Sequence, residues 1–554
     1  MEKPALNNIA AHLPEMARMQ PHVPAVYFPQ GRDRRGRVCY SHYTFSQLDR
    51  ESNRIARGLE MVGIRRGVRA VLMVPPSLDF FALTFSLFKV GAVPVLIDPG
   101  MGIKNLKVCL EEAAPEAFIG VPKAHVARLL LGWGKATIRT LLTVGTRRFW
   151  GGTTLTELIG RSGGEVDYPM AATAAGETAA ILFTSGSTGA PKGAVYSHGN
   201  FRAQVEMLRS LYDIRPGEID LPTFPLFALF APALGMTSVI PDMDFTRPGS
   251  VDPRKIIDTI ESFGVTSMFG SPALINRVGR HGQAGNIKLP TLRRVISAGA
   301  PVPAQVLQRF VGMLNEDTQV FTPYGATEAL PVCSIGSREI LGQTRNLTDQ
   351  GQGVCVGRPV AGIELHIIAI GDEPITAWDD GLKVADGTIG EIVVKGPQVT
   401  THYHNRPGST ELAKIQNPAG GFYHRMGDLG YRDQEGRIWF CGRKAHRVES
   451  SDQTRFTIPC EAIFNTHPQV FRSALVGIGE TGRQRPIICI ELESGVGKSE
   501  QPRIRRELLE IAAGHEITAG LRELLFHPAF PVDIRHNAKI FREKLALWAE
   551  KEVK

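Results

Sequence analysis

The chain has 554 residues, of which 43% are hydrophobic and 21% are charged, and its formal net charge is +8. That length exceeds one ordinary domain, and the composition is that of a globular protein with ample material for a core. The 58 glycines and 37 prolines favour a loop-rich α/β enzyme over a helical bundle.

The positive charge is spread along the sequence. Its densest cluster, residues 31–37, has no interleaved aromatic side chains, so we interpret it as a solvated loop and expect no nucleic-acid partner. A polyanionic substrate would still benefit from the positive field.

The seven cysteines lie far apart, and none forms a C-x-x-C pair. Their odd number and wide spacing favour reduced thiols in a cytoplasmic setting and disfavour a zinc site. We expect no signal peptide, because Glu2, Lys3, Glu15 and Arg18 interrupt the N-terminal region.

Two long apolar stretches raise the question of a membrane span. Residues 80–97 are interrupted by Lys89 and Gly91, and residues 221–241 carry no charge but contain several prolines. Because prolines break a spanning helix, we expect no transmembrane segment and interpret both stretches as buried interior. The second is long enough to line an apolar pocket, although plain core explains its composition equally.

In chain order, the first sixty residues predict a short helix and then an amphipathic helix from about residue 43 to Leu59. Thr44 and Gln47 have the spacing of a capping box at its start.

Residues 68–324 alternate between apolar strands and helical segments. The predicted strands are 68–74, 93–97, 117–121, 139–144, 179–183, 267–270, 292–297 and 319–324. The predicted helices are 78–89, 200–211, 253–263 and 303–314. This alternation is typical of an α/β protein with layered, mostly parallel sheets.

The pattern changes near Gly357. Residues 363–370 and 389–395 predict strands of an antiparallel unit, and residues 426–430 and 433–436 predict turns before a strand at 438–441. The last part predicts a helix at 460–465, strands at 473–477 and 486–492, and a charged helix at 504–515. We therefore expect an N-terminal domain of residues 1–442 with an antiparallel β subdomain, and a small, mobile α+β domain of residues 443–554.

Residues 184–193 read T-S-G-S-T-G-A-P-K-G and follow a predicted buried strand. Glycines let backbone N–H groups approach a ligand, hydroxyls add donors, and Lys192 adds a charge. The pattern is neither a Walker A loop nor a dinucleotide-binding turn. We interpret it as a polyphosphate cradle; a mobile surface loop is the alternative.

Further motifs follow in a fixed order. They are L-F-K-V-G-A-V-P-V-L-I-D-P at 87–99, A-G-A-P at 298–301, Y-G-A-T-E at 324–328, G-E-I-V-V-K-G-P at 390–397, R-M-G-D at 425–428, G-R at 442–443, and Lys539. Over about residues 40–545 the chain resembles the AMP-forming adenylating superfamily, which includes acyl-CoA synthetases, peptide-synthetase adenylation domains and firefly luciferase.

The resemblance implies that ATP and Mg²⁺ are used and that a carboxylate attacks the α-phosphate of ATP. Tyr324 and Gly325 would flank adenine, Thr327 would contact the α-phosphate, and Glu328 would hold Mg²⁺. The other residues that the resemblance assigns to the nucleotide are Thr184, Ser185, Gly186, Ser187, Thr188, Gly189, Lys192, Gly299, Ala300 and Pro301.

Three further residues complete the implied site. Asp428 would accept hydrogen bonds from the ribose hydroxyls, and Arg443 would lie near the ribose and phosphates. Lys539 would neutralise charge that develops on the α-phosphate, with Thr327 and Glu328 as the other catalytic residues. Local sequence alone leaves a turn aspartate and a surface lysine as alternatives, and we interpret His198 as structural.

Three departures from the superfamily pattern lie on its thioester-forming machinery. Ala445 occupies the position of the hinge residue about which the C-terminal domain rotates, Ala228 replaces a common histidine, and residues 448–459 replace a short glycine turn. We therefore do not expect CoA as a cosubstrate.

With these departures, the chain looks most like the OleC-type β-lactone synthetases of bacterial olefin biosynthesis. That resemblance implies a long-chain 2-alkyl-3-hydroxy fatty acid as substrate, closure of a β-lactone, and other olefin-biosynthesis enzymes as partners in an assembly. A long-chain fatty acyl-CoA ligase, a fatty acyl-AMP ligase and a non-catalytic binding protein are the alternatives. No residue stands out as the base for ring closure.

Overall fold

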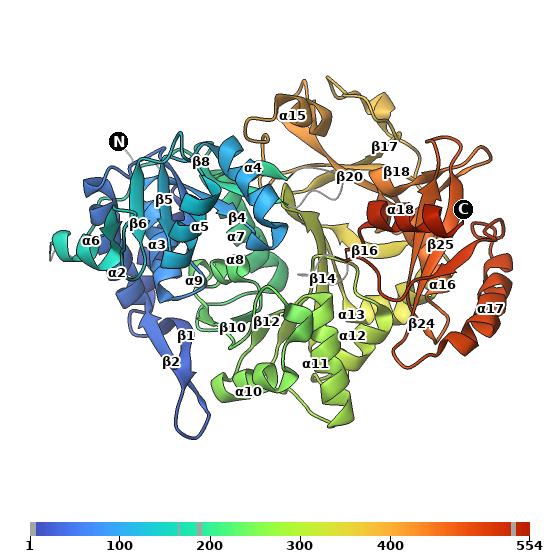
Figure 1. Cartoon of the computed structure of the whole chain (residues 1–554), viewed down its shortest axis with the longest axis horizontal. Helices are drawn as coiled ribbons and strands as arrows, with labels where there is room; N and C mark the ends of the chain where they lie inside the picture. Colours follow the sequence, from blue (N-terminus) through green and yellow to red (C-terminus); the bar gives the residue numbers. More distant parts are fainter. Residues whose placement is uncertain (1–6, 164–166, 185–190, 533–538, 554) are drawn as a thin grey trace.

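The computed structural model describes residues 7–163, 167–184, 191–532 and 539–553 (Figure 1). Two large sheets with their helices fill the part of the molecule drawn in blue, green, yellow and orange (Figure 1). The C-terminal elements, drawn in red, lie at the opposite end from the N-terminal helices (Figure 1).

The first large sheet has the strand order β7-β6-β5-β3-β4-β8-β9 and is parallel except for the last pair. Its strands are β3 (Arg69–Met73), β4 (Val93–Ile97), β5 (Ala117–Gly120), β6 (Thr140–Thr143), β7 (Thr153–Thr154), β8 (Thr178–Thr184) and β9 (Lys192–Ser197). Helices α4 (Ile103–Ala113) and α5 (Pro122–Leu131) share one core cluster with this sheet, and α2 (Phe45–Met61) and α3 (Leu78–Val90) belong to another. The predicted parallel layer is therefore present.

The second large sheet runs β17-β18-β20-β21-β16-β15-β14-β13-β12-β10-β11-β1-β2, with β19 (Lys414–Gln416) beside β20. From β14 to β1 the neighbouring strands are parallel, namely β14 (Gln319–Ala326), β13 (Arg294–Ile296), β12 (Ser267–Phe269), β10 (Ile219–Pro222), β11 (Thr237–Val239) and β1 (Pro24–Arg32). From β14 to β17 they are antiparallel, namely β15 (Ala329–Gly336), β16 (Val354–Pro359), β21 (Ile438–Arg443), β20 (Phe422–Arg432), β18 (Gly390–Lys395) and β17 (Glu364–Ile368). The predicted antiparallel unit is thus the continuation of one mixed sheet.

Helices cover the parallel part of this sheet. Helix α7 (His198–Tyr212) lies against β9 and β15, and the parallel part is covered by α10 (Pro253–Phe263), α11 (Pro272–Ala284) and α12 (Ala304–Val311). The last three pack with β10, β12 and β13 in one buried cluster.

After β21 the chain forms smaller sheets. The pair β22 (Val448–Glu449) and β23 (Thr454–Arg455) is followed by a sheet of β24 (Val470–Ile478), β25 (Arg485–Leu492) and β26 (Leu524–Phe526). Helices α16 (Thr457–Phe464), α17 (Gln501–Ala513) and α18 (Arg542–Glu552) pack on them. This is the small α+β arrangement that the sequence predicts.

The predicted turn at residues 426–430 is wrong, because these residues lie inside β20. Gly427 has φ +65°, and the register with β21 shifts between Leu429 and Gly430, so the glycines form irregularities within the strand. The turn at 433–436 is confirmed by the hydrogen bond from the Gly436 N–H to the Asp433 carbonyl. The hairpin of β1 and β2 (Val38–Thr44), whose tip carries most of the basic cluster, was not predicted.

The predicted capping box of α2 is confirmed. The Gln47 N–H donates to Thr44 Oγ1 at 3.2 Å, and the Thr44 N–H donates to Gln47 Oε1 at 2.8 Å. The helix therefore starts where its first unpaired N–H groups are satisfied by side chains.

Both long apolar stretches are interior. Lys89, which interrupts the first, is buried and donates to Asp49 Oδ1 at 2.6 Å, Ser52 Oγ at 2.7 Å and Asn53 Oδ1 at 2.6 Å. A buried ammonium needs such compensation. None of the helices in the described ranges is both long and apolar enough to cross a bilayer.

Candidate active site

A cavity of about 1870 Å³ lies where both large sheets meet the C-terminal elements. Its walls include the segment after β13, the end of β14, Asp428 of β20, Arg443 of β21 and Lys539. Part of the predicted site therefore lines one space together with Lys539, although its members are far apart in sequence, namely Gly299, Ala300, Pro301, Tyr324, Gly325, Asp428 and Arg443. Lys192, Thr327 and Glu328 are not among the residues that line this cavity.

Asp428 is at the centre of a polar cluster. Its Oδ2 accepts a hydrogen bond from the Tyr324 hydroxyl at 2.7 Å, and its Oδ1 lies 2.9 Å from Arg443 Nη1. The Arg443 contact is not aligned as a hydrogen bond, so Oδ1 has no hydrogen-bond donor among the described residues. A buried acceptor in that state is suited to a ligand hydroxyl.

Electrostatics link Asp428 to Lys539. Burial raises the pKa of the Asp428 carboxyl, and the charges of Arg443 and Lys539 oppose that rise. The charge of Asp428 raises the pKa of Arg443 in turn. Lys539 therefore lies close enough to the predicted ribose site for its charge to act on Asp428.

Thr327 and Glu328 are the two residues between the paired positions Ala326 and Ala329, so they form the tight connection from β14 to β15. Gly325 permits this approach, since a Cβ there would lie 2.6 Å from the Ala329 carbonyl oxygen. The Thr327 carbonyl accepts a hydrogen bond from the Tyr196 hydroxyl. Tyr196, which lies on β9 of the first sheet, therefore fixes the backbone of this turn.

Tyr403 holds the Glu328 carboxylate. Its hydroxyl donates to Glu328 Oε1 at 2.7 Å, and Lys192 Nζ lies 5.2 Å from the centre of its ring. Tyr403 therefore connects the end of the predicted phosphate loop with the predicted Mg²⁺ ligand.

The phosphate loop itself is only partly described. Lys192 begins β9 and Pro191 lines the cavity. Thr184 ends β8, and Ser185, Gly186, Ser187, Thr188 and Gly189 lie outside the described residues.

Gly299, Ala300 and Pro301 follow β13 at the carboxyl end of the parallel strands and line the cavity with Tyr324 and Gly325. In open α/β sheets, ligands bind outside the carboxyl ends of the strands. The position agrees with the nucleotide side of the predicted site.

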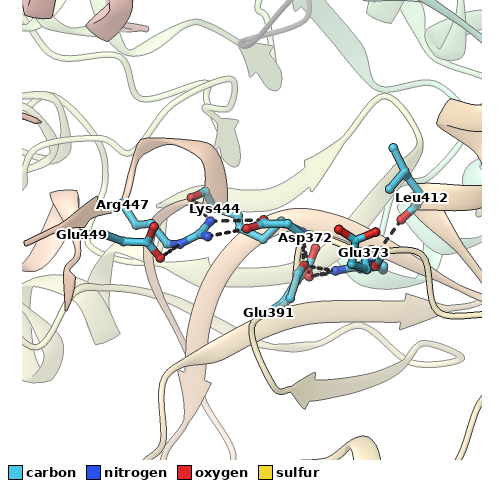
Figure 2. Close-up of polar contacts among 9 residues, drawn as sticks. Asp372, Glu373, Glu391, Leu412, Lys444, Arg447 and Glu449 are labelled. Carbon is cyan, nitrogen blue, oxygen red and sulfur yellow. Dashed lines mark hydrogen bonds and ion pairs between the residues drawn. The ribbon is translucent and has the colours of Figure 1, made fainter. Parts of the chain in front are cut away.

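The hinge segment is bound to the antiparallel part of the second sheet (Figure 2). Lys444 Nζ donates to the Gly371 carbonyl at 2.7 Å and to Glu391 Oε2 at 3.1 Å. Arg447 Nη2 donates to Asp372 Oδ2 at 2.6 Å, and Arg447 Nε to Glu449 Oε1 at 2.8 Å. Ala445, between these two cations, lines the cavity.

Ala228 and His198 have surroundings typical of structural positions. Ala228 is fully buried in a core cluster that contains most of the buried side chains of residues 221–241. None of the side chains that the structure describes in that stretch lines the large cavity. The His198 Nδ1 accepts a hydrogen bond from the Ile9 N–H at 3.2 Å, and burial lowers the pKa of His198 to about 4.

Sequence reasoning missed Tyr403, Tyr196 and Lys414. Lys414 is buried, which lowers its pKa to about 7, and it donates to the Thr400 carbonyl beside Tyr403. Their local sequences carry no phosphate- or metal-binding pattern. The only local signal for Tyr403 as a site residue is that its neighbours at 401–405 are polar, and that signal is weak.

Comparison with known proteins gives three results. A family model described as AMP-binding enzyme matches residues 13–404. An olefin beta-lactone synthetase of Xanthomonas campestris pv. campestris is 51% identical over 552 residues, covering 99% of this chain and 98% of the relative, and one of Stenotrophomonas maltophilia is 52% identical with the same coverage. A solved anthranilate CoA ligase in complex with anthranoyl-AMP has a TM-score of 0.81 at 18% identity, covering 100% of this chain and 99% of that chain.

Proposed function

We propose that this chain, which belongs to the AMP-binding enzyme family, converts a long-chain 2-alkyl-3-hydroxy fatty acid into a β-lactone at the expense of ATP. The observation that carries the proposal is identity of 51% and 52% to two olefin beta-lactone synthetases over nearly the whole chain. Such coverage includes both the nucleotide cluster and the segment after residue 442.

In the first step, a carboxylate oxygen of the fatty acid attacks the α-phosphorus of ATP, and pyrophosphate leaves. Asp428 would hold the ribose, Tyr324 and Gly325 the adenine, and Lys192 the leaving phosphates. Lys539 would stabilise the charge that develops on the α-phosphate oxygens. Most of the acceleration in such a displacement comes from positioning and electrostatics.

The residues present fit a Mg²⁺ ion that is held mainly by the nucleotide. No cluster of three or more His, Cys, Asp or Glu side chains suited to a metal occurs in the described part of the chain. Glu328, positioned by Tyr403, supplies one carboxylate, and Mg²⁺ usually combines one or two carboxylates with substrate phosphates. When bound, the ion would neutralise charge on the phosphates.

In the second step, the 3-hydroxyl oxygen attacks the carbonyl carbon of the acyl-adenylate. The C–O bond of the lactone forms, the bond to AMP breaks, and the hydroxyl proton is released. No external thiol is required, since the substrate supplies its own nucleophile at high effective concentration. The departures at Ala445, Ala228 and residues 448–459 support this route, because they affect positions that the superfamily uses for thioesters.

The experiment is incubation of the purified protein with Mg·ATP and a 2-alkyl-3-hydroxy fatty acid without CoA. We expect AMP, pyrophosphate and a product lighter than the acid by one water. The second candidate is a long-chain fatty acyl-CoA or acyl-AMP ligase. A CoA ligase is among the proteins that share this fold. A thioester formed only with CoA, or release of free acyl-AMP as the product, would support that candidate instead.

Three further points belong to the proposal. We place the domain boundary at residues 442–446, so that residues 443–554 form the lid over the cavity. We propose a cytoplasmic enzyme that works beside other olefin-biosynthesis enzymes, since its lipid intermediates would be poorly soluble.

A further inference from the structure

One stretch of the chain is basic over forty residues without any acidic residue. Residues 117–156 contain six Lys or Arg residues and no Asp or Glu, in a chain whose net charge is +8. This stretch forms β5, α5, β6 and β7 at one edge of the first large sheet. The edge lies far from the C-terminal elements (Figure 1).

Large apolar side chains protrude from the same stretch. Leu129 and Leu130, at the end of α5, are 43% and 81% exposed, and Phe149 is 79% exposed. Phe149 is held beside α5, because its ring packs at 5.4 Å on Trp150, which stacks at 5.2 Å on His125 of α5. All three apolar side chains are exposed, and Phe149 is fixed in place by Trp150.

Several Lys and Arg residues of the same stretch form no ion pair among the residues that the structure describes. Lys123, Lys135 and Arg148 are exposed, and none of them forms an ion pair with a carboxylate within the described ranges. Arg147, by contrast, lies 3.5 Å from Glu157. We call the six residues Lys123, Leu129, Leu130, Lys135, Arg148 and Phe149 the α5 patch.

Helix α5 shares a core cluster with a helix that contributes to the cavity wall. Helices α4 and α5 pack on the same face of the first sheet, in one core cluster. Asn105 of α4 lines the cavity, and Ile103, two residues earlier, is 60% exposed. Helix α4, the neighbour of α5 in this cluster, therefore reaches the cavity wall.

We propose that the α5 patch docks on the surface of a bilayer that contains anionic phospholipids. Exposed Leu and Phe side chains among Lys and Arg residues have the chemistry of an interfacial anchor, in which apolar groups enter the headgroup region and cations contact phosphate. Residues 117–156 contain no carboxylate, and Glu157, which follows them, is paired with Arg147 at 3.5 Å, so little repulsion from such a surface is expected.

The test is cosedimentation of the full-length protein with vesicles, without ATP or substrate. Vesicles of phosphatidylcholine are compared with an equimolar mixture of phosphatidylcholine and phosphatidylglycerol at low and physiological salt. We expect binding to the anionic vesicles only, weakened by salt.

Two patch variants and a matched control locate the contact. Each cation near an anionic surface strengthens binding about fivefold, so Lys123→Gln/Lys135→Gln/Arg148→Gln should weaken binding about a hundredfold. Leu130→Ser/Phe149→Ser should weaken it about tenfold. Arg34→Gln/Arg35→Gln/Arg37→Gln removes the same charge at the β1–β2 hairpin and should stay within about threefold of the unchanged protein.

Absence of binding to anionic vesicles by the unchanged protein would overturn the proposal. An equal loss in the hairpin control and the patch variant would also overturn it, because the effect would then follow net charge alone. Equal unfolding temperatures show that the variants fold. None of these results bears on lactone formation, which is measured separately with dispersed substrate.

Discussion

The nucleotide side of the cavity and the hinge segment each contain a buried carboxylate beside basic side chains, but the two carboxylates differ in how completely they are hydrogen-bonded. Asp428 has one oxygen bound to Tyr324 and one without an aligned donor among the described residues, and its partner Arg443 is one-third exposed. At the hinge, Glu391 Oε2 receives two bonds from Arg425, at 3.1 and 2.6 Å, and one from Lys444 at 3.1 Å.

This difference in hydrogen bonding distinguishes groups that can still bind a ligand from groups whose bonds stabilise the fold. Glu391 and Arg425 are almost fully buried, so their charges are satisfied within the protein. Asp428 and Arg443 face the cavity, where a ribose and phosphates would complete their contacts. We therefore expect changes at the hinge network to alter stability first, and changes at the nucleotide cluster to alter catalysis first.

The largest expected effect is on stability. Glu391→Ala would leave Arg425 and Lys444 without their buried carboxylate, so the free energy of unfolding should fall by about 3–5 kcal/mol. Asp372→Ala, at a side chain that is 63% exposed, should cost no more than about 1 kcal/mol. Chemical denaturation of the purified variants measures both values. Similar losses in the two variants would remove the distinction between the buried and exposed parts of the network.

Next in size is the loss of Lys539. Lys539→Ala should reduce the rate of acyl-adenylate formation about 10²–10³-fold, because one charge opposite the developing phosphate charge is removed. ATP–pyrophosphate exchange measures that rate, and ATP binding should persist. Lys544→Ala, which removes another cavity lysine, is the control and should stay near the original rate. Undiminished exchange in Lys539→Ala would mean that another group stabilises the α-phosphate.

Smaller effects are expected at the ribose site. Asp428→Ala removes charge-assisted hydrogen bonds worth about 1.5–3 kcal/mol, so KM for ATP should rise about 10–150-fold. Tyr324→Phe removes one hydrogen bond to Asp428, which corresponds to about fivefold. Steady-state exchange kinetics give both constants. A larger effect of Tyr324→Phe than of Asp428→Ala would place the main ribose contact elsewhere.

The smallest effect is expected at the hinge itself. Ala445 lies in the short 3₁₀-helix Lys444–His446, a conformation whose typical φ is close to the value that proline fixes, and proline would restrict rotation there. If lactone closure occurs in the present orientation, Ala445→Pro should change lactone formation less than about threefold. Accumulation of acyl-AMP with loss of lactone would show instead that closure needs rotation.

Much of the fold was predictable because its signals are local. The strand β4 and the helix α10 have the predicted bounds, and the capping box of α2 depends on residues three apart. The strand β20 was predicted as a turn because Gly427 and Gly430 indicate a turn locally, whereas pairing with β18 and β21 decides their structure.

The site was predictable only through the order of its motifs. The resemblance to adenylating enzymes assigned Tyr324 to the adenine and Asp428 to the ribose, and these residues, 104 positions apart, meet within 2.7 Å. Tyr403 was missed, because its contact with Glu328 spans 75 residues and no local sequence pattern indicates it. The hinge network was missed for the same reason, because Glu391 lies in an ordinary strand.

The most direct test of the central claim uses a substrate analogue that lacks the 3-hydroxyl group. Given a 2-alkyl fatty acid without that hydroxyl, Mg·ATP and CoA, the enzyme should form acyl-AMP in an amount close to that of the enzyme and then stop. The matched 3-hydroxy acid should turn over to lactone whether or not CoA is present. Steady formation of an acyl-CoA thioester from the analogue would contradict the account, since an external thiol would then be the natural acceptor.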